Sequence, residues 1–432
     1  MTVRMRGEVR RELSAGERWF WLIDQLSPAN CVVRIRVRGA IGAYRLEEAA
    51  AALVAEFPLL RAVVREGPRF EPSADPHLPV VHRVVDGTQE WREVFDEQLN
   101  EPVDLATAPG RIIDLAWRPA TSAEFHDVIV VFSHVLIDGR SLASLASRLL
   151  ANAVGAAPGA GARPPILPAD AMIPPRYTGV VPCLRANLAG QLGALGRRAL
   201  GIPGEPPPLP VRRTRTVHRT IDGAELVALR DRCRTEDVTV NSALVAALAT
   251  AMGELFRPGG TGFAGIGIPV DVRSRLRPAP AADEPGMFTA VVPTFVPFGR
   301  RRSVHDAAWA VKSQLSRHIH RGTDLSALAA IRYGCPRTLE SGKRAIELVD
   351  RRAPWNITLS NLGRLATPET PEPLRITALT VAGTNSCASA MTVAVATHGD
   401  TLSITFCYVD TLVPHSAIEL LADRTVASVL RW

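Results

Sequence analysis

Residues 127–142 read Asp-Val-Ile-Val-Val-Phe-Ser-His-Val-Leu-Ile-Asp-Gly-Arg-Ser-Leu. The apolar run at 127–132 predicts a buried strand, and the residues from 140 onward have the spacing of a helix. His134 stands where the strand ends, four residues before Asp138, and Gly139 permits the sharp turn between them. A histidine held rigidly at that point can face a cavity, and its ordinary pKa of about 6.5 suits a general base. This stretch therefore predicts a strand, turn and helix that position a catalytic histidine.

The residues before this stretch alternate between helix and strand patterns. Ser14 and Glu17 precede an apolar run and form the capping-box pattern of a helix start. Val33, Ile35 and Val37 alternate with arginines, which is the period of a half-buried strand. Further helices are expected over 46–57 and 140–152, and further strands over 82–85, 113–117 and 127–132. The first 150 residues therefore indicate an α+β arrangement.

A Gly- and Pro-rich segment at 155–175 separates the two halves of the chain. A second Pro-rich segment, 201–210, follows an amphipathic segment at 184–200, and both belong to the expected connection. The second half predicts helices over 223–233, 241–256, 304–320 and 415–430, and strands over 263–269, 290–296, 356–360, 391–397 and 402–408. In the last strand, the even-numbered residues form one apolar face. We expect two lobes, 1–175 and 176–432.

Composition excludes several classes of protein. The 432 residues are 47% hydrophobic and 22% charged, which is typical of a folded globular chain. The net charge is +7, and 48 of the 50 basic residues are arginines, a compositional bias that makes this charge weak evidence for an acidic partner. The basic segment 212–219 lacks the aromatic residues of a nucleic-acid groove. Six scattered cysteines, no signal-peptide pattern and no apolar run of spanning length predict a cytoplasmic protein without a membrane span, and nucleic acid is not an expected partner.

Eight segments together resemble the acyltransferase superfamily that includes chloramphenicol acetyltransferase, peptide-synthetase condensation domains, polyketide-associated acyltransferases and wax ester synthases. His134 to Gly139 resembles its His-x3-Asp-Gly motif, and Pro-Val-Asp-Val-Arg at 269–273 is similar to its Pro-Val-Asp-Leu-Arg motif. The other matching segments lie in the superfamily's order at 13–22, 56–61, 101–109, 239–241, 286–288 and 360–363. Ser133 replaces the first histidine of a pair, and Met287 replaces an asparagine.

The resemblance implies two chloramphenicol-acetyltransferase-like lobes, each a mixed sheet with helices, and an active-site tunnel at the lobe interface. It implies that His134 is the general base in acyl transfer from a thioester. Backbone N–H groups around Gly139 and the Asn361 side chain are candidates for stabilising the oxyanion. A salt bridge between Asp138 and Arg273 is implied, with a structural role that aims His134.

The expected donor is acyl-CoA or an acyl carrier protein, so CoA or phosphopantetheine carries the acyl group and no permanently bound cofactor or metal is expected. The acceptor is a small molecule with a hydroxyl or amine, and O-acylation in secondary metabolism or lipid tailoring is the favoured reaction. Condensation-type amide formation is the nearest alternative. A repurposed fold that catalyses cyclisation or pericyclic chemistry, and a non-catalytic relative that binds a carrier protein, also remain open.

Several other conspicuous side chains are expected to have structural rather than catalytic or ligand-binding roles. Two histidines two positions apart on a helix point to different faces and make a poor metal pair. We expect surface positions for His318 and His320, packing for Trp19 and Trp21, buried unreactive thiols for Cys387 and Cys407, and a solvated linker for 212–219.

Overall fold

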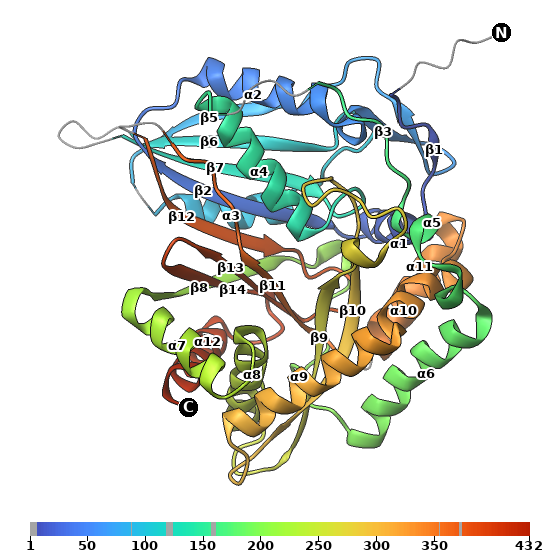
Figure 1. The fold of residues 1–432 in the computed structure, drawn as a ribbon, viewed down its shortest axis with the longest axis vertical. Coiled ribbons are helices and arrows are strands. Elements are labelled where there is room, and N and C mark those ends of the chain that lie inside the picture. The colour runs from blue at the N-terminus through green and yellow to red at the C-terminus, as the bar shows by residue number, and fades with distance from the viewer. Residues whose placement is uncertain (1–6, 88, 118–123, 157–160, 354, 371–373) are drawn as a thin grey trace.

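The computed structural model describes residues 7–432 except 88, 118–123, 157–160, 354 and 371–373. Two lobes, each containing a sheet and helices, lie one above the other in Figure 1. The fold is therefore α+β with mixed sheets, and this prediction is confirmed. Within the part of the chain that is described, no single helix is long and apolar enough to cross a membrane, although one bent helix pair passes that test by length and composition.

The upper lobe is built on a five-stranded sheet in the order β12-β2-β7-β6-β5. Its strands are β2 (Asn30–Arg38), β5 (Val80–Val85), β6 (Gly110–Trp117), β7 (Phe125–Ser133) and β12 (Arg375–Gly383). A small sheet, β1-β4-β3, comprises β1 (Arg11–Glu12), β3 (Ala62–Arg65) and β4 (Arg69–Pro72). The helices of this lobe are α1 (Ala15–Asp24), α2 (Ala43–Glu56), α3 (Trp91–Asn100) and α4 (Gly139–Ala153).

The lower lobe is built on a six-stranded sheet in the order β10-β9-β11-β13-β14-β8. Its strands are β8 (Thr214–Asp222), β9 (Gly262–Asp271), β10 (Thr289–Phe298), β11 (Ile357–Arg364), β13 (Met391–His398) and β14 (Thr401–Val409). The remaining helices are α5 (Ala169–Met172), α6 (Val180–Arg197), α7 (Gly223–Thr235), α8 (Val240–Phe256), α9 (Val304–Arg321), α10 (Thr323–Gly334), α11 (Leu339–Arg352) and α12 (His415–Arg431).

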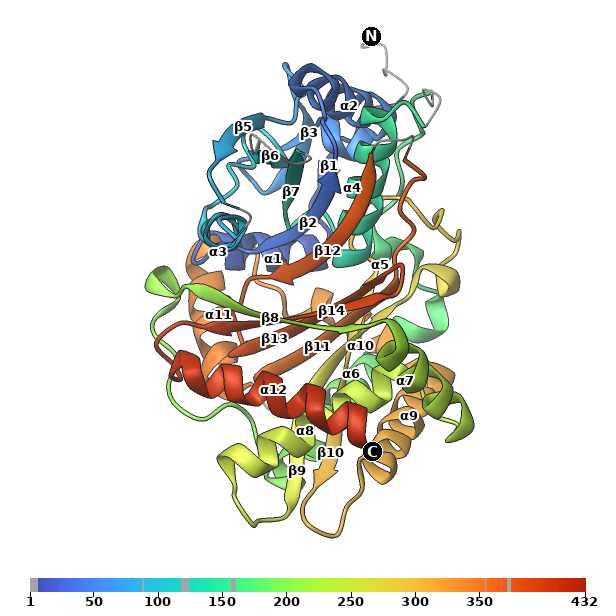
Figure 2. The same ribbon diagram turned by 90° about the vertical axis from the view of Figure 1, so that its left-hand side faces the viewer.

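Strand β12 links the two lobes. It follows the lower-lobe strand β11 in the chain, yet it pairs antiparallel with β2 at the edge of the upper sheet, where Val381 lies opposite Val33. Figure 2 shows this late strand beside the early strands of the upper lobe. The boundary at residue 175 stays a prediction, but the upper sheet includes residues from both sides of it.

Strand β14 is buried on both faces, whereas its alternation predicted one apolar face. Phe406 and Tyr408 pack into the lower-lobe core. Cys407, on the other face, packs into the upper-lobe core. The residues of β14 that face the upper lobe are small or weakly polar and can be buried there. The alternation along β14 therefore separates large from small buried side chains, not buried from exposed ones.

The prediction of a solvated linker at 212–219 is wrong. Arg212 is 5% exposed and its guanidinium binds the Asp350 carboxylate at 2.8 Å, while Thr214 begins β8. His218 on this strand packs against Trp91 of α3, with ring centroids 4.9 Å apart. Arg212 is buried by an ion pair just before the strand, and His218 on the strand by aromatic contacts, so the segment has no apolar period, which explains why the pattern suggested a linker.

Candidate active site

His134 lies directly after β7, and contacts with the backbone hold it in place. Its own N–H donates to the Ala29 carbonyl at 2.6 Å, and its Nδ1 lies 2.8 Å from the Ile137 carbonyl oxygen. Because a carbonyl oxygen only accepts, Nδ1 carries the proton in this hydrogen bond and Nε2 of the neutral ring has a free lone pair. The ring stacks on Phe20 with centroids 4.2 Å apart. The fold therefore fixes both the tautomer and the plane of the imidazole.

Burial lowers the pKa of His134, and the nearby charge of Asp138 opposes that shift without cancelling it. The imidazole is consequently neutral at pH 7 and able to accept a proton. The Met287 sulfur lies 3.2 Å from Nδ1, on the edge of the ring that already faces Ile137. Met287 thus contacts the histidine by its thioether and leaves Nε2 available.

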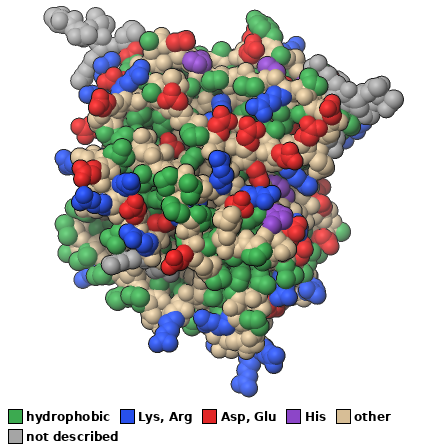
Figure 3. All heavy atoms as spheres, turned by 180° about the vertical axis from the view of Figure 1, so that it is seen from behind, with side chains coloured by type: hydrophobic (Ala, Val, Ile, Leu, Met, Phe, Trp, Pro, Cys, Tyr) green, Lys and Arg blue, Asp and Glu red, His purple; other side chains and the backbone are tan. Residues whose placement is uncertain are grey.

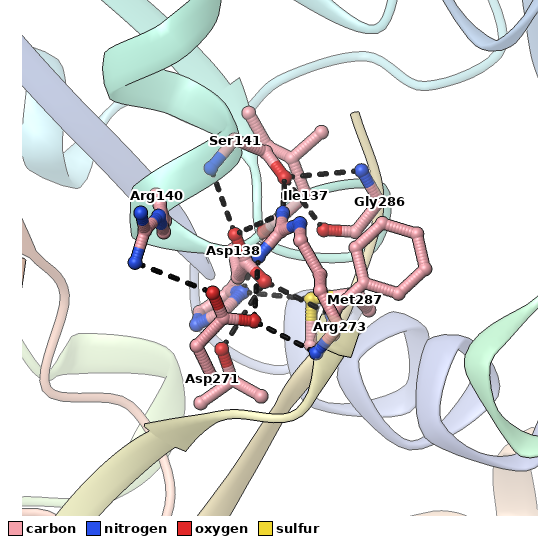
Figure 4. Close-up of polar contacts among 11 residues, drawn as sticks. Ile137, Asp138, Arg140, Ser141, Asp271, Arg273, Gly286 and Met287 are labelled. Atoms are coloured by element: carbon pink, nitrogen blue, oxygen red, sulfur yellow. Dashed lines mark hydrogen bonds and ion pairs between the residues drawn. The ribbon is translucent and has the colours of Figure 1, made fainter. Parts of the chain in front are cut away.

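His134 and Asp138 lie on the same loop, and Asp138 connects this loop to residues of the lower lobe (Figure 4). Its carboxylate lies 3.1 Å from the Arg273 guanidinium, and the two side chains are 2% and 5% exposed. The other carboxylate oxygen accepts from the Phe288 N–H at 2.9 Å. Asp138 also caps α4 by accepting from the Ser141 N–H at 2.8 Å. The salt bridge that the resemblance implied is thus present, within a wider network.

The electrostatics of this network favour the charged form of Asp138. Burial alone raises its pKa, but Arg273 and the donated hydrogen bonds outweigh burial and lower the pKa below its ordinary value. Arg273 also contacts Asp271 at 3.2 Å and the Ser141 hydroxyl at 2.6 Å, and it stacks on the Phe288 ring. A buried ion pair with this many partners fixes the loop geometry around His134.

A cavity of about 540 Å³ lies beside His134 at the junction of the lobes. Helices α1, α4 and α10 and strands β2, β11 and β12 all contribute to its wall, so neither lobe forms it alone. Its lining is mainly apolar and includes Trp19, Phe20, Ile23, Val32, Met287, Val291, Leu328, Ile331, Trp355 and Leu362. Such an apolar space suits an apolar ligand and the stabilisation of developing charge by fixed dipoles.

The remaining candidate residues lie close to this cavity or directly behind it. Gly139, at the start of α4, lines it, and a Cβ built there would come within 3.2 Å of the Leu362 side chain. Asn361 also lines it, and its side-chain oxygen accepts from the Gly363 N–H at 2.9 Å. Ser133 is buried, and its hydroxyl accepts from the Val135 N–H at 3.3 Å. Ser133 thus stabilises the turn that holds His134.

The structure adds site residues that the sequence analysis did not single out for chemistry. Phe20 stacks on His134, and Trp19 lines the cavity rather than only packing in the core. Both lie on α1, in the opening segment that resembles the superfamily, and that resemblance is the available signal. Cys387 also lines the cavity, but burial raises the pKa of its thiol to about 12. This thiol is therefore not a nucleophile at neutral pH.

The two histidines of α9 form no metal site. His318 Nδ1 pairs with the Thr323 hydroxyl at 2.8 Å, and among the described residues no group of three histidine, cysteine or acidic side chains has metal-binding geometry.

Comparison with known proteins agrees with this architecture. Residues 210–412 match the family model described as the phthiocerol/phthiodiolone dimycocerosyl transferase C-terminus. None of the curated proteins matches the chain by sequence. Polyketide synthase associated protein 5 from Mycobacterium tuberculosis aligns over 98% of this chain and 99% of its own, with 17% identity and a TM-score of 0.68.

Two further solved structures have the same fold. The epimerization domain from the third module of tyrocidine synthetase B covers 100% of this chain and 98% of its own, at 14% identity and a TM-score of 0.70. A trichothecene 15-O-acetyltransferase from Fusarium sporotrichioides covers 97% of this chain and 94% of its own, at 11% identity and a TM-score of 0.72. The expected resemblance is confirmed for the fold, which the chain shares over nearly its whole length with these condensation-type and acyltransferase structures.

Proposed function

We propose that the protein transfers an acyl group from a thioester to a hydroxyl, with His134 as the general base. One observation carries the proposal. Burial keeps the imidazole neutral, and the Ile137 carbonyl fixes its tautomer on one edge, beside an apolar cavity built by both lobes. That arrangement prepares a proton acceptor in a mainly apolar space, which suits general-base attack on a thioester and disfavours competing hydrolysis.

The proposed step is balanced by two proton transfers. The acceptor hydroxyl gives its proton to His134 Nε2 while its oxygen attacks the thioester carbonyl carbon. When the tetrahedral intermediate collapses, the carbon–sulfur bond breaks and the imidazolium returns the proton to the departing thiolate. Asp138 raises the pKa of His134 by its charge and so stabilises the transient imidazolium.

Two groups in the cavity wall are the proposed oxyanion donors. The backbone N–H of Gly139 belongs to the first turn of α4, where helix geometry provides no intrahelical acceptor. The side-chain oxygen of Asn361 accepts a hydrogen bond from the Gly363 N–H, so the amide nitrogen is the group left to donate to an oxyanion. Removal of an oxyanion donor typically costs about 2.7–4 kcal/mol of transition-state stabilisation.

The comparisons support a hydroxyl acceptor in secondary metabolism or lipid tailoring. The matching family model describes a dimycocerosyl transferase, and one solved relative is named an O-acetyltransferase. The proposed donor is acyl-CoA or an acyl carrier protein, in which CoA or phosphopantetheine carries the acyl group without being a resident cofactor. Donor and acceptor would meet in the 540 Å³ cavity.

The test is incubation of purified protein with a series of acyl-CoA and acyl carrier protein thioesters and hydroxyl or amine acceptors, followed by mass spectrometry. We expect an ester product, and we expect His134→Ala to lower the rate by about 10²–10⁴-fold. Cys387→Ala is the matched control, because Cys387 lines the same cavity but has no role in the proposed step.

Three other results would each overturn this proposal. An amide product would support condensation-type chemistry, and a rearranged acceptor without acyl addition would support cyclisation. Carrier-protein binding without turnover would indicate a non-catalytic relative.

A further inference from the structure

Helix α6 has an exposed apolar face that the proposed reaction does not use. Six aliphatic residues on it are between 47% and 72% exposed: Val180, Val181, Leu184, Leu188, Leu192 and Leu195. At 3.6 residues per turn, they fall within an arc of about 120° that runs the length of the helix. We call these six residues the α6 stripe. Exposed aliphatic residues are common singly, but a continuous row indicates a contact surface.

The opposite side of α6 is the one that packs against the protein. Cys183 and Ala194 are 2% and 5% exposed. A Cβ added at Gly193 would lie 2.6 Å from the Phe295 ring of β10, so the helix approaches that strand closely. Figure 1 shows α6 at the outer edge of the lower lobe, outside α10. The α6 stripe is therefore the outward face of a helix whose opposite face packs against the protein.

All charged side chains along α6 are cationic. From residue 171 to residue 204 the sequence contains no aspartate or glutamate. Arg185, Arg197 and Arg198 lie within or at the end of the helix, and all three are exposed. Arg332 of the neighbouring α10 is also exposed, and its guanidinium binds the Thr178 carbonyl just before α6. On the upper part of the back of the molecule, by contrast, acidic and basic side chains are interspersed (Figure 3).

We propose that the α6 stripe docks on an anionic lipid surface. Aliphatic residues flanked by arginines, without carboxylates, form the pattern of helices that lie in the membrane interface. The aliphatic side chains enter the acyl boundary while Arg185 and Arg198 contact acidic headgroups. Arg197 instead lies over the Phe263 and Phe295 rings on the inner side of the helix. A projecting, convex helix fits a flat, deformable surface better than a second folded protein, which must offer a matching groove.

A second copy of the chain is a poorer occupant on two grounds. One helix face exposes on the order of a few hundred Å², less than the roughly 800 Å² per partner of a stable protein interface. Packing the α6 stripe against itself would also bring arginines of the two copies together without carboxylates to pair them.

Docking at this face would place the membrane near the cavity. A Cβ built at Gly190, on the inner side of α6, would contact the ring of Trp355 at 3.8 Å, and Trp355 lines the cavity beside His134. The bilayer would therefore lie on the side of the lower lobe where α6 packs behind one wall of the cavity. The docking itself does not depend on the proposed reaction.

The test is flotation of the full chain with vesicles of phosphatidylcholine alone or with added phosphatidylglycerol. We expect the wild type to bind the anionic vesicles, and less so as salt rises. Leu188→Glu with Leu192→Glu should weaken this binding by at least about tenfold, because two side chains that enter the lipid become charged. Val227→Glu with Leu420→Glu, at positions 50% and 41% exposed on α7 and α12, is the matched control with the same added charge.

Circular dichroism and the thermal midpoint establish that both double variants fold. The proposal is overturned if the wild type ignores anionic vesicles at low salt, or if the control pair loses binding as strongly as the α6 pair. It is also overturned if the α6 pair converts a dimer to a monomer by light scattering, or abolishes binding of an acidic acyl carrier protein while vesicle binding stays unchanged. Because the readout is vesicle binding, failure of acyl transfer leaves this result intact.

Discussion

The ion pair between Asp138 and Arg273 should show strong energetic coupling when its members are replaced singly and together. Arg273→Met leaves a carboxylate that is 2% exposed without its counter-charge, which should destabilise the protein by about 3–5 kcal/mol. Asp138→Asn keeps an oxygen for the Ser141 N–H but turns an amide toward the Phe288 N–H, a donor facing a donor. That change should cost about 1–3 kcal/mol.

The double variant contains neither buried charge, so its loss should be smaller than the sum of the single losses by about 2 kcal/mol. Urea unfolding of the four proteins at neutral pH measures the cycle, provided that each transition is two-state. Losses that add to within about 0.5 kcal/mol would refute the reasoning. Such additivity would mean that the two side chains stabilise the loop independently.

The lowered pKa of Asp138 gives this pair a pH signature. Its stabilising contribution is fully present above the ordinary aspartate pKa of about 3.8 and disappears as the pH falls through the lower pKa of the folded state. Asp138→Asn should therefore lose less stability than the wild type on acidification below that value.

Arg273→Met should also lower kcat, because the loop that positions His134 loses its ion pair with the lower lobe.

Three further variants test separate parts of the structure. His218 has its pKa lowered to about 3 by burial and nearby arginines, so stability should fall by up to about 1.4 kcal/mol per unit as the pH drops from about 6.5, and His218→Gln should flatten that slope in urea midpoints. Gly253→Ala should destabilise by about 1–3 kcal/mol despite better helix propensity, because its Cβ would lie 2.3 Å from the Phe298 ring; an unchanged thermal midpoint would contradict this. Phe20→Leu should lower kcat by about tenfold or more without changing the fold, because the His134 ring loses its stacking partner, and steady-state kinetics with circular dichroism would detect this.

Local signals in the sequence predicted the parts of the fold that depend on neighbouring residues. The capping box of Ser14 and Glu17 is present, with the Ser14 N–H donating to the Glu17 carboxylate at 2.7 Å. The strand before His134 and the helix after it also lie where the pattern placed them. In these segments, hydrophobic period and capping chemistry agree with the tertiary structure.

Contacts between distant segments could not be predicted in the same way. Strands β12 and β2 pair although more than 300 residues separate them in the sequence, as Leu379 opposite Ile35 illustrates. Phe20 becomes a site residue only because α1 passes the end of β7, and nothing in its local pattern distinguishes it from a core aromatic residue. The Asp138–Arg273 pair was expected from the superfamily resemblance and not from the spacing of the two residues.

The pH dependence of kcat/KM for acyl transfer tests the central claim most directly. If the neutral imidazole of His134 is the base, kcat/KM should rise through a single ionisation below the ordinary histidine pKa of about 6.5, because burial lowers the pKa of this group, and then stay level toward pH 8. His134→Ala should abolish that ionisation along with most of the rate. A profile that is flat in the wild type, or an inflection that survives in His134→Ala, would contradict the account.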